Sequence, residues 1–183
     1  MKYFFKDHDA EKADLYYEGL LDDPNYDKDE HFDIIGEDYR RLIRTCCRYS
    51  AYFSVIVWND EISGAKELEK FRIPAPPTIT YEQMRGYFDG VYSLDAVRYY
   101  KVTDELCELL LSMADAILEW LNGWGFQNPE NPVFYREDGS VFFASVIHDG
   151  ECMLDPREDE EDAVSAIVQC DGWVTNNSYH FNF

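Results

Sequence analysis

Apolar residues recur at intervals of three and four between Asp104 and Asn122, which is the spacing of one face of an α-helix. These apolar positions are Leu106, Leu110, Met113, Ile117 and Trp120, with Leu109, Leu121 and Trp124 widening the stripe. The narrow polar face between them consists of Glu108, Ser112, Asp115 and Glu119. Gly123 follows at a position where helices commonly end. The pattern predicts a central, largely buried helix over residues 104–122.

Other segments show shorter helical patterns. They are residues 9–21, 37–48, 64–71, 81–89 and 156–169. At the start of the last of these segments, Asp155 is a suitable N-cap residue and Pro156 is suitable for the first helical position. Glu158 is placed to act as the capping-box partner of Asp155. Val164, Ile167 and Val168 then form its buried side. We therefore expect a capped helix to begin at the acidic run "DPREDEED".

Alternating or β-rich runs predict strands at residues 52–58, 133–136, 141–148, 151–154 and 173–175. Asp138-Gly139 and Asp149-Gly150 separate three of these runs, and Asp-Gly is typical of two-residue hairpin turns. Residues 133–154 therefore predict a three-stranded antiparallel meander, which the strand at 173–175 rejoins. The expected fold is α+β, a largely antiparallel sheet packed by helices, in a single domain over residues 1–183.

The composition suits a folded chain with an unusual charge. Of the 183 residues, 46% are hydrophobic and 16% are aromatic. A chain of this size and composition can form a hydrophobic core without disulfide bonds or structural metal ions. The net charge of −21 divides into −9 over residues 1–38, +3 over residues 39–101 and −15 over residues 102–183. This charge argues against direct binding to nucleic acid or to an anionic membrane, both of which require clustered basic residues.

The cysteines indicate a reducing compartment. They are five in number, and Cys46 and Cys47 are adjacent, which favours free thiols over a disulfide framework. The N-terminus "MKYFFKDHD" has too short an apolar run for a signal peptide, and no run is long enough to span a bilayer. We therefore expect a cytoplasmic protein.

Neither of two candidate metal sites has the required ligands. His148 and Cys152 lie on adjacent predicted strands, but a two-residue turn pairs His148 with Glu151 and so directs the two side chains to opposite faces. The run from Asp23 resembles the start of a calcium loop, yet Lys28 replaces the required glycine and Ile34 the required acid. The sequence predicts no bound metal.

No catalytic or cofactor motif is present. Neither Cys46 nor Cys47 is followed by arginine six residues later, Gly123-x-Gly125 lacks its third glycine at Asn128, and no nucleophile elbow or P-loop occurs. Paired carboxylates are so abundant that a carboxylate-based hydrolase has no specific support. The sequence therefore predicts a protein that is not an enzyme and has no cofactor.

One basic stripe offers an alternative. Arg40, Arg44 and Arg48 share one face of the helix predicted over residues 37–48, with Arg41 beside them. Such a stripe suits phosphate or another anion. Pairing with the chain's own acids is favoured, because phosphate sites usually add backbone N–H groups from a glycine-rich turn.

Part of the acidity exceeds what local structure requires. Helix capping and the helix dipole account for about four of the six carboxylates between Asp155 and Asp162. The remaining charges, with the acidic run near the N-terminus, predict a partner-binding surface. Its candidate residues are Glu158, Glu161, Asp162, Asp22, Asp23, Asp27, Asp29 and Glu30.

These observations together predict an intracellular acidic inhibitor that neutralises a basic partner protein. The expected form is a bacterial or phage protein of the toxin-immunity or nuclease-inhibitor type. One alternative is a nucleic-acid mimic that opposes a defence protein, and another is a phosphate- or nucleotide-binding protein that uses Arg40, Arg44 and Arg48.

Overall fold

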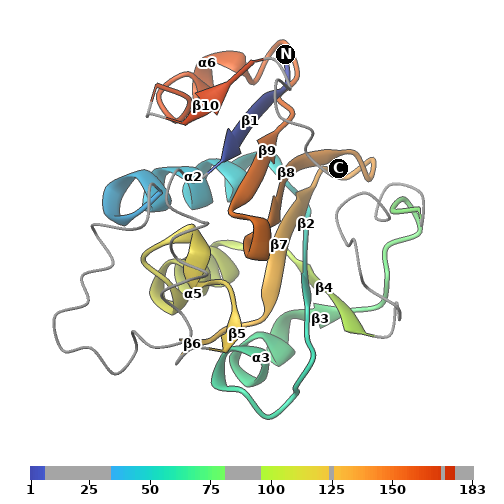
Figure 1. The fold of residues 1–183 in the computed structure, drawn as a ribbon. Coiled ribbons are helices and arrows are strands. Elements are labelled where there is room, and N and C mark those ends of the chain that lie inside the picture. The colour runs from blue at the N-terminus through green and yellow to red at the C-terminus, as the bar shows by residue number, and fades with distance from the viewer. Residues whose placement is uncertain (7–33, 81–95, 124–125, 170–171, 176–183) are drawn as a thin grey trace, which may run out of the picture.

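One antiparallel sheet organises the protein (Figure 1). The computed structural model describes residues 1–6, 34–80, 96–123, 126–169 and 172–175. Eight strands of this part run in the spatial order β10-β1-β9-β8-β7-β2-β4-β3, and each neighbouring pair is antiparallel. They are β1 (Tyr3–Lys6), β2 (Tyr52–Ile56), β3 (Arg72–Ile73), β4 (Val97–Lys101), β7 (Glu130–Tyr135), β8 (Val141–Val146), β9 (Glu151–Leu154) and β10 (Trp173–Val174). A separate short pair joins β5 (Asn122–Gly123) to β6 (Phe126–Gln127).

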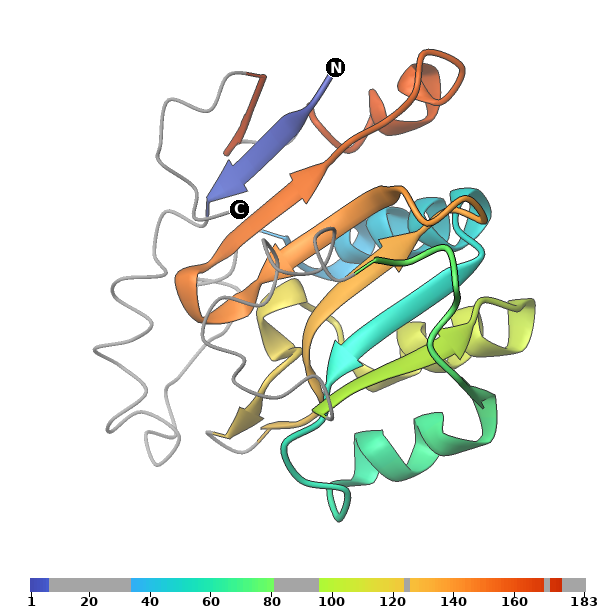
Figure 2. The ribbon, with the colours of Figure 1, turned by 90° about the vertical axis from the view of Figure 1, so that its right-hand side faces the viewer.

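Helices α2 (Gly36–Tyr49) and α5 (Asp104–Met113) lie together on one face of this sheet (Figure 2). The buried residues of α3 (Ser63–Leu68), which continues into a 3₁₀ turn over Glu69–Phe71, and of α6 (Glu161–Val164) join the same core. Helices packed on a largely antiparallel sheet confirm the predicted α+β class. The single domain over residues 1–183 stays a prediction.

Both faces of the sheet are apolar. The helix side holds fully buried aromatic rings from β1, β2, β7 and β8, with Phe53 packed 4.8 Å from Phe134 and 5.8 Å from Trp120 between ring centroids. The opposite face is a second buried cluster that includes Val133, Tyr135 and Met153. Alternation along each strand explains the division, because successive side chains point to opposite faces.

The predicted meander is confirmed as β7, β8 and β9, but its turns are longer than predicted. Arg136 and Ser140 close the first turn through a 2.9 Å N–H···O bond, and only Gly139 within it has a positive φ, of 84°. Asp138 thus has a negative φ, and only Gly139 adopts the left-handed conformation, whereas the predicted two-residue turn needs a positive φ at both residues. In the second turn a 3₁₀ segment over Ile147–Asp149 precedes Gly150. Val146 therefore pairs with Glu151, and the predicted pairing of His148 with Glu151 is wrong.

The prediction of a helix over residues 104–122 is right at its start and wrong in its second half. Thr103 caps α5 by accepting a hydrogen bond from the N–H of Leu106 at 3.1 Å, and the helix ends at Met113. The chain then runs extended and pairs with residues 34–36, where the Gly36 N–H donates to the Asp115 carbonyl at 2.8 Å. The later apolar residues, Ile117, Leu118 and Trp120, are still buried. Their spacing thus reports burial in the core without requiring one continuous helix.

The predicted helix over residues 156–169 is also too long. Only Glu161–Val164 is α-helical, so the expected N-cap at Asp155 is wrong, although Val164 and Ile167 are buried as predicted. The predicted helix at 37–48 is confirmed as α2, that at 64–71 as α3 with its 3₁₀ turn, and the strand at 173–175 rejoins the sheet beside β1. The helices predicted at 9–21 and 81–89 lie outside the described residues.

Candidate functional site

Two of the three arginines in the predicted stripe on α2, Arg40 and Arg44, pair with acids of their own chain. Arg40 contacts Asp115 at 2.7 Å, and Arg44 contacts Glu37 at 3.5 Å between nitrogen and oxygen atoms. Arg48 lies over the ring of Tyr49, 5.4 Å from its centroid. This arrangement favours internal pairing over the anion site that the same stripe suggested.

A buried ion pair anchors the acidic segment that follows β9. The Nε of Arg136 donates to Oε1 of Glu160 at 2.9 Å, its Nη2 donates to Oε2, and both side chains are 7% exposed. The same guanidinium donates at 2.7 Å to the carbonyls of Val141 and Asp155. Glu160 also accepts the N–H of Arg157 at 2.7 Å. One guanidinium thus ties the turn after β7, the start of β8, the end of β9 and the start of α6 together.

These contacts control the ionisation of Glu160. Burial opposes the charged carboxylate, but the hydrogen bonds from Arg136 and from the Arg157 N–H outweigh it, so the pKa lies below its ordinary value. Sequence reasoning missed this role and assigned Glu160 to the helix dipole. The sequence did contain a clue to this ion pair: Arg136 and Arg157 are the only arginine or lysine residues from residue 102 onward, so each has many possible acidic partners.

Arg157 forms a second, exposed ion pair with Asp138 in the turn after β7. Hydrogen bonds from the Ser140 hydroxyl and N–H, and then from Arg157, hold the pKa of Asp138 well below its usual range. Both basic residues of the C-terminal block are therefore engaged within the chain.

Three of the predicted partner-binding residues lie together near α6, but they differ in accessibility. Glu161 accepts a hydrogen bond from the Tyr3 hydroxyl at 2.8 Å and another from the amino group of Met1 at 2.5 Å, and these contacts lower its pKa. Glu158 and Asp162 are exposed, as is Asp159, and no ion pair joins their side chains to any residue that the structure describes. The other five candidates, Asp22, Asp23, Asp27, Asp29 and Glu30, lie outside the described residues.

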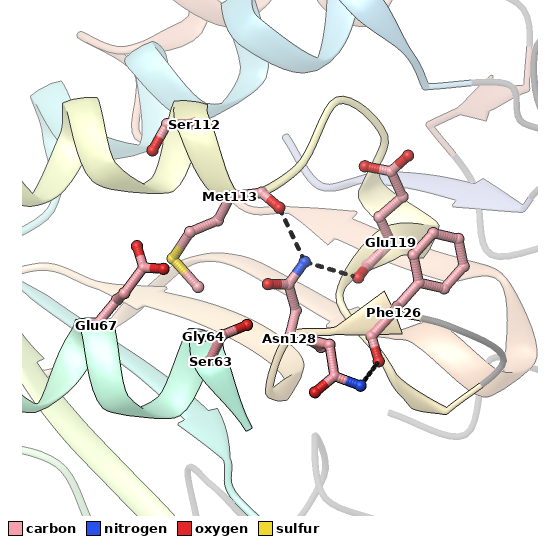
Figure 3. A pocket seen from close by; sticks show the side chains of 9 residues that line it. Ser63, Gly64, Glu67, Ser112, Met113, Glu119, Phe126 and Asn128 are labelled. Carbon is pink, nitrogen blue, oxygen red and sulfur yellow. Dashed lines mark hydrogen bonds between the residues drawn. The ribbon is translucent and has the colours of Figure 1, made fainter. Parts of the chain in front are cut away.

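A pocket of about 310 Å³ lies elsewhere, between α3, the end of α5 and β6 (Figure 3). Its lining residues are Ser63, Gly64, Glu67, Ser112, Met113, Glu119, Phe126, Gln127 and Asn128. No motif in the sequence indicates this pocket, because its walls come from three separate segments and Phe126–Gln127 lies beyond the helix predicted over residues 104–122. Its lining contains two carboxylates and no basic side chain.

No known protein family, curated protein or solved structure matches this chain. Within residues 1–6, 34–80, 96–123, 126–169 and 172–175, no three histidine, cysteine, aspartate or glutamate side chains are placed to hold a metal ion. No helix of the same ranges has the length and apolar character needed to cross a bilayer. The four cysteines described, Cys46, Cys47, Cys107 and Cys152, are free thiols, as predicted.

Proposed function

We propose that this protein is a cytoplasmic acidic inhibitor that binds and neutralises a basic protein, in the manner of an immunity protein or a nuclease inhibitor. The observation that carries the proposal is the group of exposed carboxylates Glu158, Asp159 and Asp162, which are free of ion pairs to described residues. We call these three residues the α6 acidic patch. Exposed charges of one sign steer a partner of opposite charge and increase the rate of association.

The surroundings of the α6 acidic patch support this proposal. Glu160, inside the same run, is fixed to the buried guanidinium of Arg136, and Val164 anchors the following turn in the core. The patch is thereby carried on an ordered support, and ordering a flexible segment would otherwise oppose binding. The two nearby arginines form their ion pairs with Glu160 and Asp138, and neither forms an ion pair with a carboxylate of the patch.

Charge-neutralising variants of matched composition test the proposal. Glu158→Gln with Asp162→Asn removes two charges from the patch, whereas Glu108→Gln with Asp149→Asn removes two exposed charges elsewhere. Proteins captured from host lysate at low salt would be identified, purified and titrated against the three chains over a salt series. We expect a basic partner whose affinity falls roughly three- to tenfold for the patch variant, with a weaker salt dependence, and hardly changes for the control.

Equal affinity and equal salt dependence for the patch variant and the wild type would remove the α6 acidic patch from the binding surface. Competition distinguishes the narrower mimic hypothesis: a nucleic-acid mimic must be displaced from its partner by DNA or RNA. A ternary complex of the partner with nucleic acid and this protein would contradict mimicry while leaving inhibition by another surface in place. Arg44→Ala tests the phosphate-binding alternative, which predicts loss of a thermal shift caused by phosphate-bearing ligands.

A further inference from the structure

The pocket between α3, α5 and β6 is built by a close approach of two backbones. A Cβ atom placed on Gly64 of α3 would lie 2.7 Å from the carbonyl oxygen of Gln127, so only glycine allows this contact without displacement. Glu67 extends from the next turn of α3 toward Met113 at the end of α5, so the two helices face each other across the pocket (Figure 3). The site is thus a hollow with walls from three elements.

Asn128 supplies the best-defined polar group of this hollow. Its side-chain nitrogen donates to the carbonyls of Met113 at 3.1 Å and Glu119 at 3.0 Å. If the amide were flipped, its oxygen would face these two carbonyl oxygens. The two hydrogen bonds therefore establish which side-chain atom of Asn128 is the nitrogen and which is the oxygen. Asn128 is 8% exposed, and no described residue donates to its Oδ1, which lies on the side of Ser63 and Gly64 (Figure 3). This oxygen is not sealed from solvent, so it stays available to a donor from outside the chain.

Three further lining residues offer acceptors. Glu67 is exposed, with no ion pair to the described part of the chain, while the carboxylate of Glu119 accepts the N–H of Asp115 at 2.7 Å. The Ser112 hydroxyl donates its hydrogen to the Leu109 carbonyl at 2.7 Å and keeps lone pairs to offer. Phe126 adds an aromatic ring beside Glu119 (Figure 3). Together these groups attract a hydrogen-bond donor that carries positive charge.

We propose that this pocket binds an organic cation, a primary ammonium or a guanidinium group. Such groups carry only donors, match the carboxylate and carbonyl acceptors, and gain from an aromatic neighbour. A divalent metal is a poorer match, because Ca²⁺ takes six or more oxygen ligands and no described cluster of three acids or metal-binding side chains exists. The volume of about 310 Å³ lies at the lower end for ligand sites, which suits a small cation or one side chain.

The same chemistry comes from a free amine or guanidine and from a lysine or arginine side chain of another protein. This inference does not rest on the proposed function, since the pocket and the α6 acidic patch are separate features with no residue in common. It does give a basic partner a second point of contact, if the ligand is a side chain.

Titration with defined probes tests the proposal. We would follow the side-chain amide of Asn128 and the backbone N–H of Gly64 by NMR while adding n-butylammonium or n-butylguanidinium at constant ionic strength. We expect saturable shifts at both positions. Affinity should fall roughly threefold or more in Glu67→Gln, and the shifts should vanish in Glu67→Lys, which brings its own ammonium to the pocket.

Two controls make the result specific. Glu108→Gln removes an exposed charge from α5 outside the pocket lining and should bind like the wild type. The Glu158→Gln, Asp162→Asn variant should also bind normally, so failure of the proposed function and failure of this one are separable. No saturable shift with either probe, or equal affinity in Glu67→Gln and Glu67→Lys, would overturn the proposal.

Blocked amino acids then identify the source. Binding of N-acetyl-lysine amide or N-acetyl-arginine amide as tight as that of the simple probes supports recognition of a protein side chain. Binding of the simple probes alone supports a free small molecule. Either result leaves the cation site in place.

Discussion

Arg136 and Glu160 form an ion pair in the interior, with each side chain only 7% exposed. Removing one partner leaves the other charged, buried and unpaired, which typically costs about 3–5 kcal/mol. We therefore expect Arg136→Met or Glu160→Gln to lower the free energy of unfolding by about that amount, measured by urea denaturation. The double variant Arg136→Met with Glu160→Met should lose clearly less than the two single losses combined. Additive losses would show that the two side chains act independently.

Acid should weaken the protein through the same carboxylate. The pKa of Glu160 is lower in the folded protein than its ordinary value of 4.5, so its ionised form stabilises the fold above that pH. This contribution is lost progressively as the pH falls from about 4.5 through the lower folded-state pKa. Urea denaturation between pH 7 and pH 3 should show the difference between wild type and Glu160→Gln shrinking at the acid end. A constant difference would mean that Glu160 ionisation does not contribute.

Tyr39 links α2 to the segment after α5 by a buried hydroxyl. It donates to the Leu110 carbonyl at 3.1 Å and accepts the indole N–H of Trp120 at 2.9 Å, and both rings are fully buried. Tyr39→Phe leaves that indole N–H without a partner, so we expect a loss of about 1–3 kcal/mol in unfolding free energy. Tyr52→Phe is the matched control, since no described group bonds its hydroxyl, and it should change stability by less than about 0.5 kcal/mol. Equal effects of the two variants would contradict this role.

The cysteine thiols should differ in reactivity. A hydrogen bond from Cys47 lowers the pKa of Cys107, whereas burial raises that of Cys46. Because the thiolate is the nucleophile, iodoacetamide at neutral pH should alkylate Cys107 before Cys46 in a Cys170→Ser background. Mass spectrometry of the digested protein measures the order, and Cys47→Ala should slow alkylation of Cys107. Faster alkylation of Cys46 would contradict the assignment.

The sheet could be predicted where the information is local. The meander follows from alternating runs divided by Asp138-Gly139 and Asp149-Gly150, and α2 follows from its helical spacing. β1 and β4 were missed because short aromatic strands carry no local sign of partners that lie far along the chain. The helix beyond Met113 was overpredicted because a helical spacing of apolar residues also arises when an extended segment and a 3₁₀ turn fill the same core.

The candidate site shows the same division. Glu158 and Asp162 are exposed as charged residues usually are, although Glu158 lies before the helix and not on the predicted helical face. The role of Glu160 depends on Arg136, which is 24 positions earlier, and the pocket depends on the approach of α3 to β6 at Gly64. Tertiary packing determines these contacts, so the spacing of residues along the sequence does not predict them.

The position of β1 has a consequence for biosynthesis. Residues 3–6 leave the ribosome well before both neighbours of β1 in the sheet, β9 and β10, which lie about 150 residues later in the chain. β1 therefore lacks its partners until residues 151–154 emerge, and until then Tyr3 and Phe5 on one side and Phe4 on the other are not covered by the folded sheet. Pairing across so long a loop is entropically slow and exposes the nascent chain to aggregation. The order of the strands thus makes this edge of the sheet one of the last parts that can close during folding.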